Sequence, residues 1–161
     1  MSELPNPTAH RPGPRVLTEP ELSSLLSRQR FGVLASVRVG GHPHLSTVVY
    51  SWDPDEGTVR VSSTADRLKV RQLRRNPRAA LHTSPDPWSF AVAEGEAEVS
   101  EPARTPGDAV GLELLGLAPG AGPGPEERAA FLEQQVAESR VVVRLRVSRL
   151  YGTALEVPAA E

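Results

Sequence analysis

Cysteine is absent from the 161 residues of this chain. Its absence excludes disulfide bonds, thiolate catalysis and thiolate metal sites, and it is compatible with a reducing cytoplasm. The chain also has no long apolar run and no apolar core near its N-terminus, so we expect neither a membrane span nor a signal peptide. The length suits one domain with a real core. We therefore expect a soluble, cytoplasmic, single-domain protein.

Several other functional classes lack their signals. The net charge of −2, from 18 basic and 20 acidic side chains, does not favour a nucleic-acid partner. The glycine-rich segment 120–124 follows no strand, which argues against a dinucleotide-binding motif. His42 and His44 share one face of an expected strand without an evident third ligand, so no metal site is predicted. Ser62 and Ser63 lack the flanking glycines of a nucleophile elbow, which disfavours a hydrolase.

Prolines and capping residues divide the chain. Residues 1–15 carry four prolines among polar side chains, which predicts a disordered tail, and residues 16–155 form the expected domain. Thr18 and Glu21 fit a capping box, and Leu17 and Leu22 are spaced as a hydrophobic staple. They predict a helix that ends near Arg28 and buries its leucines.

Period-two alternation, bounded by turn residues, predicts six strands at 31–37, 45–52, 58–62, 78–83, 88–99 and 141–151. A basic helix that stops at Asn76 follows the third strand. A helical insertion at 104–139 precedes the last strand, with one helix capped by Thr105 and another opened by Pro125, joined by a mobile Gly/Pro-rich connection. This order predicts a mainly β fold with flanking helices, as a small closed or half-closed barrel.

The segment from Ser62 to Arg71 is the most informative part of the chain. Hydroxyl side chains lead from a strand into a basic helix, whose unpaired N–H groups and dipole favour an anion. Lys69 falls on the same helix side as Val70 and Leu73, whereas Arg67 and Arg71 lie on another side with Arg74 and Arg75. Two interpretations are open: a phosphate-binding site, or a lysine whose stem covers apolar surface beside solvated arginines.

Several segments together carry a family resemblance. The strings at 30–37, 41–46 and 67–78 resemble the pyridoxamine-phosphate-oxidase-like split barrels. Trp88 to Gly95 (WSFAVAEG) is similar to the class B F-420-dependent deazaflavin oxidoreductases within that group. The resemblance extends from Leu17 to Tyr151, which is nearly the whole expected domain.

The resemblance implies a six-stranded split β-barrel of the FMN-binding type. It also implies a homodimer with cofactor sites between the subunits, in which reduced coenzyme F-420 donates a hydride to an unidentified small-molecule acceptor. At matching positions the phosphate would be bound by Ser62, Arg67, Lys69 and Arg71. Ser46, Thr47 and Val48 would lie beside the deazaflavin ring, with Trp88 near the site from its own or the partner chain.

Alternatives remain at this level. FMN is possible because flavin-using relatives share the fold; the deazaflavin is favoured because the arginines of 67–78 could meet its acidic oligoglutamyl tail. A non-catalytic cofactor-binding barrel is a second alternative. A pyridoxamine-phosphate oxidase proper is disfavoured because no second phosphate-binding cluster is evident. No catalytic residue is assigned. Solvent, Tyr50, His44 or His82 could supply a proton, but Tyr50 can equally be a packing residue of the barrel and the histidines can be ordinary strand-edge residues.

Overall fold

The structure, a computed structural model, describes residues 13–155. The predicted tail at 1–15 lies almost entirely outside the described residues. At its end, β1 (Arg15–Val16) pairs antiparallel with the last strand, so a short strand precedes the first helix. None of the helices within 13–155 combines the length and apolar character that a bilayer-spanning helix needs.

The first helix, α1 (Glu19–Arg28), forms as its capping residues predict. The Thr18 side chain and the Glu21 carboxylate complete the capping box, and Leu22, Leu25 and Leu26 are buried. Hydrogen bonds from Arg15 and Thr18 lower the pKa of Glu21 to about 2, so this carboxylate stays charged at the positive end of the helix. The prediction of this helix is confirmed.

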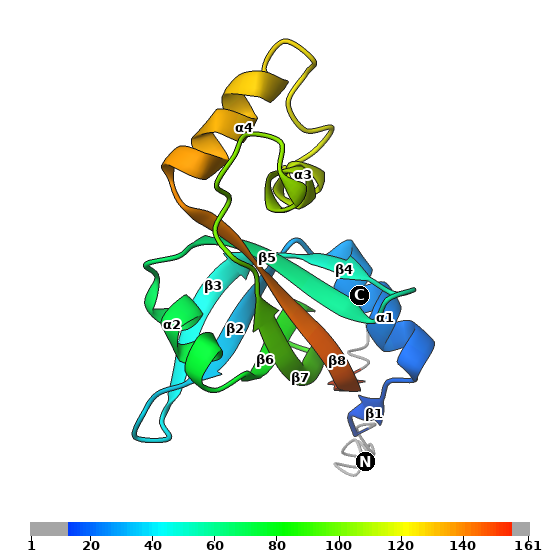
Figure 1. Cartoon of the computed structure of the whole chain (residues 1–161). Coiled ribbons are helices and arrows are strands. Elements are labelled where there is room, and N and C mark those ends of the chain that lie inside the picture. The colour runs from blue at the N-terminus through cyan, green and yellow to red at the C-terminus, as the bar shows by residue number, and fades with distance from the viewer. Residues whose placement is uncertain (1–12, 156–161) are drawn as a thin grey trace, which may run out of the picture.

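The eight strands of the described chain form one antiparallel sheet that curls into a half-barrel (Figure 1). Its hydrogen-bonded order is β3-β2-β6-β7-β8-β5-β4, with β1 beside β8. After β1 the strands are β2 (Phe31–Val37), β3 (Pro43–Val49), β4 (Ser51–Asp53), β5 (Thr58–Thr64), β6 (Arg78–Asp86), β7 (Ser89–Val99) and β8 (Arg140–Ala154). The predicted split barrel is confirmed, with eight strands in place of six.

The two edges of this sheet are joined through one residue. The order starts with β3 and ends with β4, and only Tyr50 separates these strands along the chain. The Tyr50 N–H donates to the Arg30 carbonyl at 3.1 Å, and its hydroxyl donates to the Leu26 carbonyl at 2.8 Å. The single strand predicted at 45–52 is therefore two strands, because the chain leaves β2 at Tyr50 and crosses to β5.

The basic helix α2 (Leu68–Arg75) covers one side of the barrel, between β5 and β6 in the sequence (Figure 1). Val70 and Leu73 are buried, Lys69 is half-buried, and the arginines at 67, 71, 74 and 75 are exposed. The helical-wheel prediction is confirmed. The hydroxyl residues Ser62–Thr64 belong to β5, and three residues separate them from the first helical residue, Leu68.

Helices α3 (Ala109–Gly116) and α4 (Arg128–Ala137), with their connection at 117–127, project from one end of the barrel (Figure 1) and are called the arm below. Its boundaries differ from the prediction. Asp108, not Thr105, caps α3, because its carboxylate accepts from the Gly111 N–H at 2.7 Å. The second helix begins at Arg128, not at Pro125.

Candidate functional site

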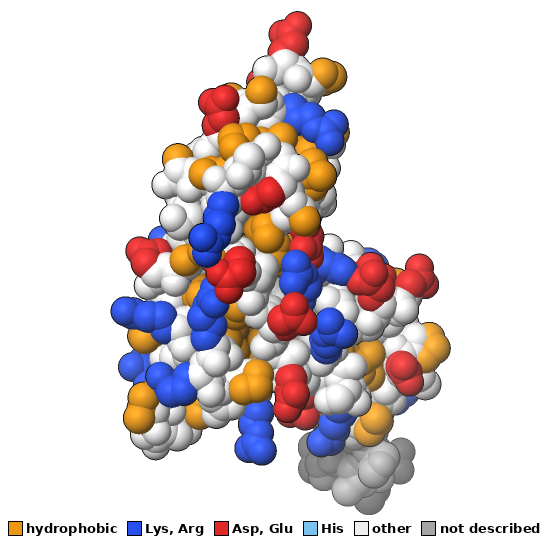
Figure 2. Space-filling model, viewed as in Figure 1, with side chains coloured by type: hydrophobic (Ala, Val, Ile, Leu, Met, Phe, Trp, Pro, Cys, Tyr) orange, Lys and Arg blue, Asp and Glu red, His pale blue; other side chains and the backbone are white. Residues whose placement is uncertain are grey.

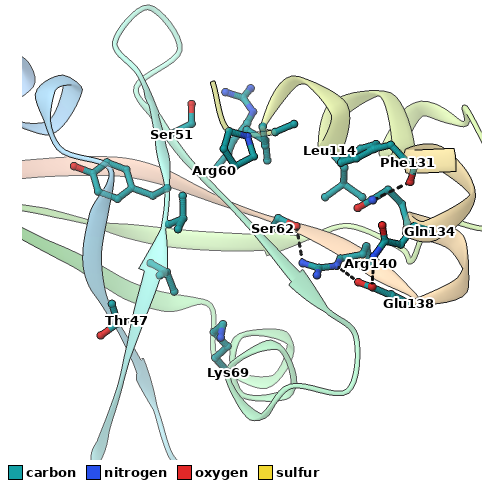
Figure 3. Close-up of a pocket in the computed structure, with 17 residues that line it drawn as sticks. Thr47, Ser51, Arg60, Ser62, Lys69, Leu114, Phe131, Gln134, Glu138 and Arg140 are labelled. Carbon is teal, nitrogen blue, oxygen red and sulfur yellow. Dashed lines mark hydrogen bonds and ion pairs between the residues drawn. The ribbon is translucent and has the colours of Figure 1, made fainter. Parts of the chain in front are cut away.

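A pocket of about 460 Å³ lies where the arm meets the barrel. Its lining comes from the β3–β4 junction, from β5 and the start of β8, from Lys69 of α2, and from both arm helices (Figure 3). One side is polar, with Ser62, Lys69 and Arg140. The side contributed by the arm is mostly apolar and includes Leu114, Leu117 and Phe131.

Lys69 is the central cation of the polar side. Its side chain points away from α2 toward the strands (Figure 3), and no carboxylate of the described residues lies within ion-pair distance. Burial, followed by the nearby Arg67, lowers the pKa of Lys69. A half-buried ammonium that neighbours another cation is stabilised by a bound anion. This donor set fits a phosphate group.

Arg140 was missed by the sequence analysis. Its Nη1 donates to the Ser62 hydroxyl at 3.2 Å, and its Nε donates to the Glu138 carboxylate at 2.7 Å (Figure 3). Between them, Ser139 adopts a left-handed backbone with φ of 50°. The sequence signal that could have indicated Arg140 was its position between the end of a helix and the start of an alternating strand. The direction of a side chain at such a junction, however, depends on the backbone angle of Ser139.

Half of the predicted site residues line the pocket, and the others do not. The lining includes Thr47, Val48, Ser62 and Lys69. Arg67 is the N-cap residue of α2, without a side-chain capping hydrogen bond, and Arg71 is exposed on the helix; both lie outside the lining. The polar side chains that line the pocket, Ser62, Lys69 and Arg140, come from three elements, β5, α2 and β8. The predicted contact of an anion with the backbone N–H groups at the start of α2 stays a prediction.

Ser46 and Trp88 also lie outside the lining of this pocket. The Ser46 hydroxyl is buried and has no hydrogen-bond partner among the described residues. Trp88 is 52% exposed in the turn between β6 and β7, so its own chain does not bring it to the pocket. Of the residues predicted beside a ring, the structure brings only Thr47 and Val48 to the site.

The sequence matches the family described as pyridoxamine 5'-phosphate oxidase over residues 18–154. The chain belongs to this family. Among solved structures it is similar to an F-420 reductase, with 26% identity, a TM-score of 0.57 and coverage of 80% of this chain and 94% of that one. A conserved hypothetical protein of Mycobacterium tuberculosis gives 22% identity, a TM-score of 0.67 and coverage of 90% and 91%.

A FAD-binding protein of Mesorhizobium loti shares the fold, with 19% identity, a TM-score of 0.61 and coverage of 89% of this chain and 98% of that one. The solved structures similar to this chain thus include one named for a reductase activity and one named for FAD binding. The similarity shows that this chain shares its fold with both proteins.

The proton-donor candidates have structural partners in this family member. Tyr50 lines the pocket, but its hydroxyl donates to the Leu26 carbonyl, and burial raises its pKa. The ring of His44 is hydrogen-bonded to Gln72 at 2.8 Å. His82 stacks on Phe90 with ring centroids 5.6 Å apart. The described residues contain no cluster of three or more His, Asp or Glu side chains suited to a metal ion.

Ion pairs fasten the arm to the barrel. Glu113 of α3 accepts from Arg60 of β5 at 3.1 Å and from Arg144 of β8 at 2.8 Å and 2.5 Å. Arg144 also reaches Glu98 of β7 at 3.2 Å. Figure 2 shows basic and acidic side chains interleaved over the strands below the arm. Beside them, Val142, Ala103 and Leu114 form a small apolar cluster, so β8 is buried on both faces there.

We expect Glu113→Gln to loosen the arm. Arg144 lowers the pKa of Glu113, so its stabilisation is present above the ordinary pKa of a carboxyl and is lost as pH falls through the depressed value. With this partly buried pair broken, opening of the arm becomes easier by about 1–2 kcal/mol. Hydrogen exchange of the α3 amides, followed from pH 7 to pH 3, measures the change.

With exchange rates corrected for the intrinsic rate at each pH, the variant should show at pH 7 the low α3 protection that the parent acquires only in acid, and the protection of the variant should depend less on pH. Glu133→Gln, an exposed change on α4, is the matched control and should exchange like the parent. Equal α3 protection in Glu113→Gln and the parent at pH 7 would contradict this role.

Proposed function

We propose that this protein is a coenzyme F-420-dependent oxidoreductase that transfers a hydride from the reduced cofactor to a small organic acceptor. The observation that carries the proposal is Lys69, a half-buried cation without a carboxylate partner among residues 13–155, beside Ser62 in a pocket at the free edge of β3. The 26% identity to an F-420 reductase across 94% of that chain supports the choice of cofactor.

In this proposal Ser62 and Lys69 hold the phosphate, and Thr47 and Val48 lie along the ring. The bound cofactor supplies the hydride chemistry. The protein orients the ring against the acceptor, and the apolar side of the arm limits access of water to it. Since the Tyr50 hydroxyl is engaged by Leu26, we assign no side chain as proton donor, and solvent remains the simplest source.

The same proposal includes a homodimer. The outward face of the β2–β3 hairpin, called the hairpin face below, carries exposed Phe31, Leu45 and Val49, at 64%, 61% and 48% exposure. Phe31 is paired with Val49 across the strands, and Thr47 lies between Leu45 and Val49 on the same face. An apolar patch that includes a pocket-lining residue is suited to a second copy of the chain. Such a copy would complete the site, and its Trp88 could approach the pocket.

We expect Phe31→Glu to convert the dimer into a monomer. A charge at Phe31, the most exposed of the three apolar residues of the hairpin face, would weaken association by about 30-fold or more, the loss typical of a buried aromatic anchor. Sedimentation velocity at micromolar protein, with Val39→Glu at the exposed hairpin tip as control, measures it. A parent that sediments as a monomer would remove the dimer from the proposal.

Titration of the purified protein with F-420 and, separately, with FMN tests the cofactor, with tryptophan fluorescence as readout. Micromolar F-420 binding with weaker FMN binding is expected. Preference for FMN would assign the protein to the flavin-using members, and no binding of either would overturn the proposal.

Anaerobic oxidation of the reduced, bound cofactor then distinguishes an enzyme from a carrier. A panel of organic acceptors is added, and the absorbance of the oxidised deazaflavin is followed. Turnover faster than that of free reduced cofactor supports the oxidoreductase. Equal rates with every acceptor would instead favour a non-catalytic binding protein. A cytoplasmic location, with which the absence of cysteine is compatible, belongs to the same proposal.

A further inference from the structure

The charges that line the pocket are unequally available to a ligand. Arg60 is engaged by Glu113 at 3.1 Å and by Asp53 at 3.5 Å, and it also pairs with Glu56. Arg140 is engaged by Glu138 at 2.7 Å. Lys69 differs from these two cations of the lining, because it has no carboxylate partner among the described residues. The polar side presents about one uncompensated positive charge to an incoming anion.

Glu138 is the acidic residue of this lining, and it is held in place from two sides. Its carboxylate accepts from the Arg140 Nε at 2.7 Å and from the Gln134 amide at 2.7 Å. The left-handed Ser139 turns the chain so that Glu138, the residue that follows α4, and Arg140, the first of β8, meet next to Ser62 (Figure 3). A phosphate at Ser62 would thus lie close to a fixed negative charge.

We propose that Glu138 tunes the charge preference of this phosphate site, lowering its affinity for a doubly charged phosphomonoester more than its affinity for a singly charged phosphodiester. The inference deepens the proposed function and rests on it. A phosphomonoester carries about −1.5 to −2 at neutral pH, whereas a diester carries a single charge. Repulsion from Glu138 is proportional to ligand charge, so the monoester is penalised about twice as strongly. The phosphate of F-420 is a diester and that of FMN is a monoester.

The test compares two ligands that share one ring. FMN carries the monoester, and riboflavin 4',5'-cyclic phosphate carries a diester on the same isoalloxazine. Dissociation constants of both, and of F-420, are measured for the parent and for Glu138→Gln at fixed low ionic strength. Glutamine keeps the length of the side chain and can still accept from Gln134, so the change removes mainly the charge.

We expect Glu138→Gln to bind all three ligands more tightly and to gain most for FMN. The ratio of the cyclic phosphate constant to the FMN constant should rise by about threefold to tenfold, which is the order of magnitude for one nearby charge in a water-rich pocket. Added salt should reduce this gain. In the double variant Glu138→Gln, Arg140→Gln the gain should shrink, because Arg140 is the cation that Glu138 neutralises.

Glu133→Gln, the exposed change on the same helix, should leave the ratio unchanged. A ratio in Glu138→Gln that equals that of the parent overturns the inference while F-420 binding by the parent still supports the proposed function. If F-420 binds to the parent but FMN stays undetectable in Glu138→Gln, the inference is also wrong. A parent that binds none of the ligands overturns the proposed function, and the inference with it.

Discussion

Lys69→Ala is expected to weaken F-420 binding by about 1.5–3 kcal/mol, which is about 10- to 100-fold in the dissociation constant. The change removes a charged hydrogen-bond donor from the pocket, and Lys69 is the lining cation that no carboxylate of the described residues engages. Folding should be retained, because burial already disfavours the charged ammonium. Tryptophan fluorescence titration measures the affinity, and thermal unfolding checks the fold.

Two arginines of α2 serve as matched controls for Lys69. Arg67→Ala should have a smaller effect than Lys69→Ala, since Arg67 lies near Lys69 but outside the lining. Arg71→Ala, an exposed change one helical turn after Arg67, should change the affinity for F-420 least. If all three variants bind alike, general positive charge around α2 attracts the cofactor, and the assignment of its phosphate to Lys69 and Ser62 is wrong.

Gly95→Ala is expected to destabilise the barrel by about 3 kcal/mol, which is a large fraction of the stability of a domain. A β-carbon at Gly95 would lie 1.8 Å from the Arg146 carbonyl oxygen and 3.1 Å from the Val147 Cα. The register between β7 and β8 shifts at Glu94 and Gly95, so the two backbones approach closely there. The clash is with backbone, which a rotamer change cannot relieve.

Urea unfolding, followed by tryptophan fluorescence, measures the loss at Gly95. Gly40→Ala is the control: it lies in the hairpin turn, has nothing within 4 Å of an added β-carbon, and should shift the midpoint little. If Gly95→Ala lowers the free energy of unfolding by less than about 1 kcal/mol, β7 and β8 separate more easily than this packing predicts.

The sequence by itself determined the parts of this protein whose signals are local. The capping box at Thr18 and Glu21 specified the start of α1, since both partners lie within one helical turn. Alternating apolar residues specified most strands of the barrel because the period of a strand is readable without its neighbours. The inward side of α2 was predicted in the same way, and it carries Lys69 into the pocket.

The tertiary structure alone decided the features that depend on distant neighbours. The predicted strand at 45–52 divides at Tyr50 because its first half pairs with β2 and its second half pairs with β5. No local signal in the sequence marks this change of pairing partner. Val142 is buried, against the alternation of β8, because the arm covers its face.

The pocket itself shows the same dependence on distant parts of the chain. Arg140 reaches Ser62 across 78 positions of sequence, and Glu113 reaches Arg60 across 53. Which charges remain free for a ligand therefore follows from long-range pairing. Local patterns in the sequence specified the barrel and one of its cations, and the packing of the arm decided the charge balance of the site.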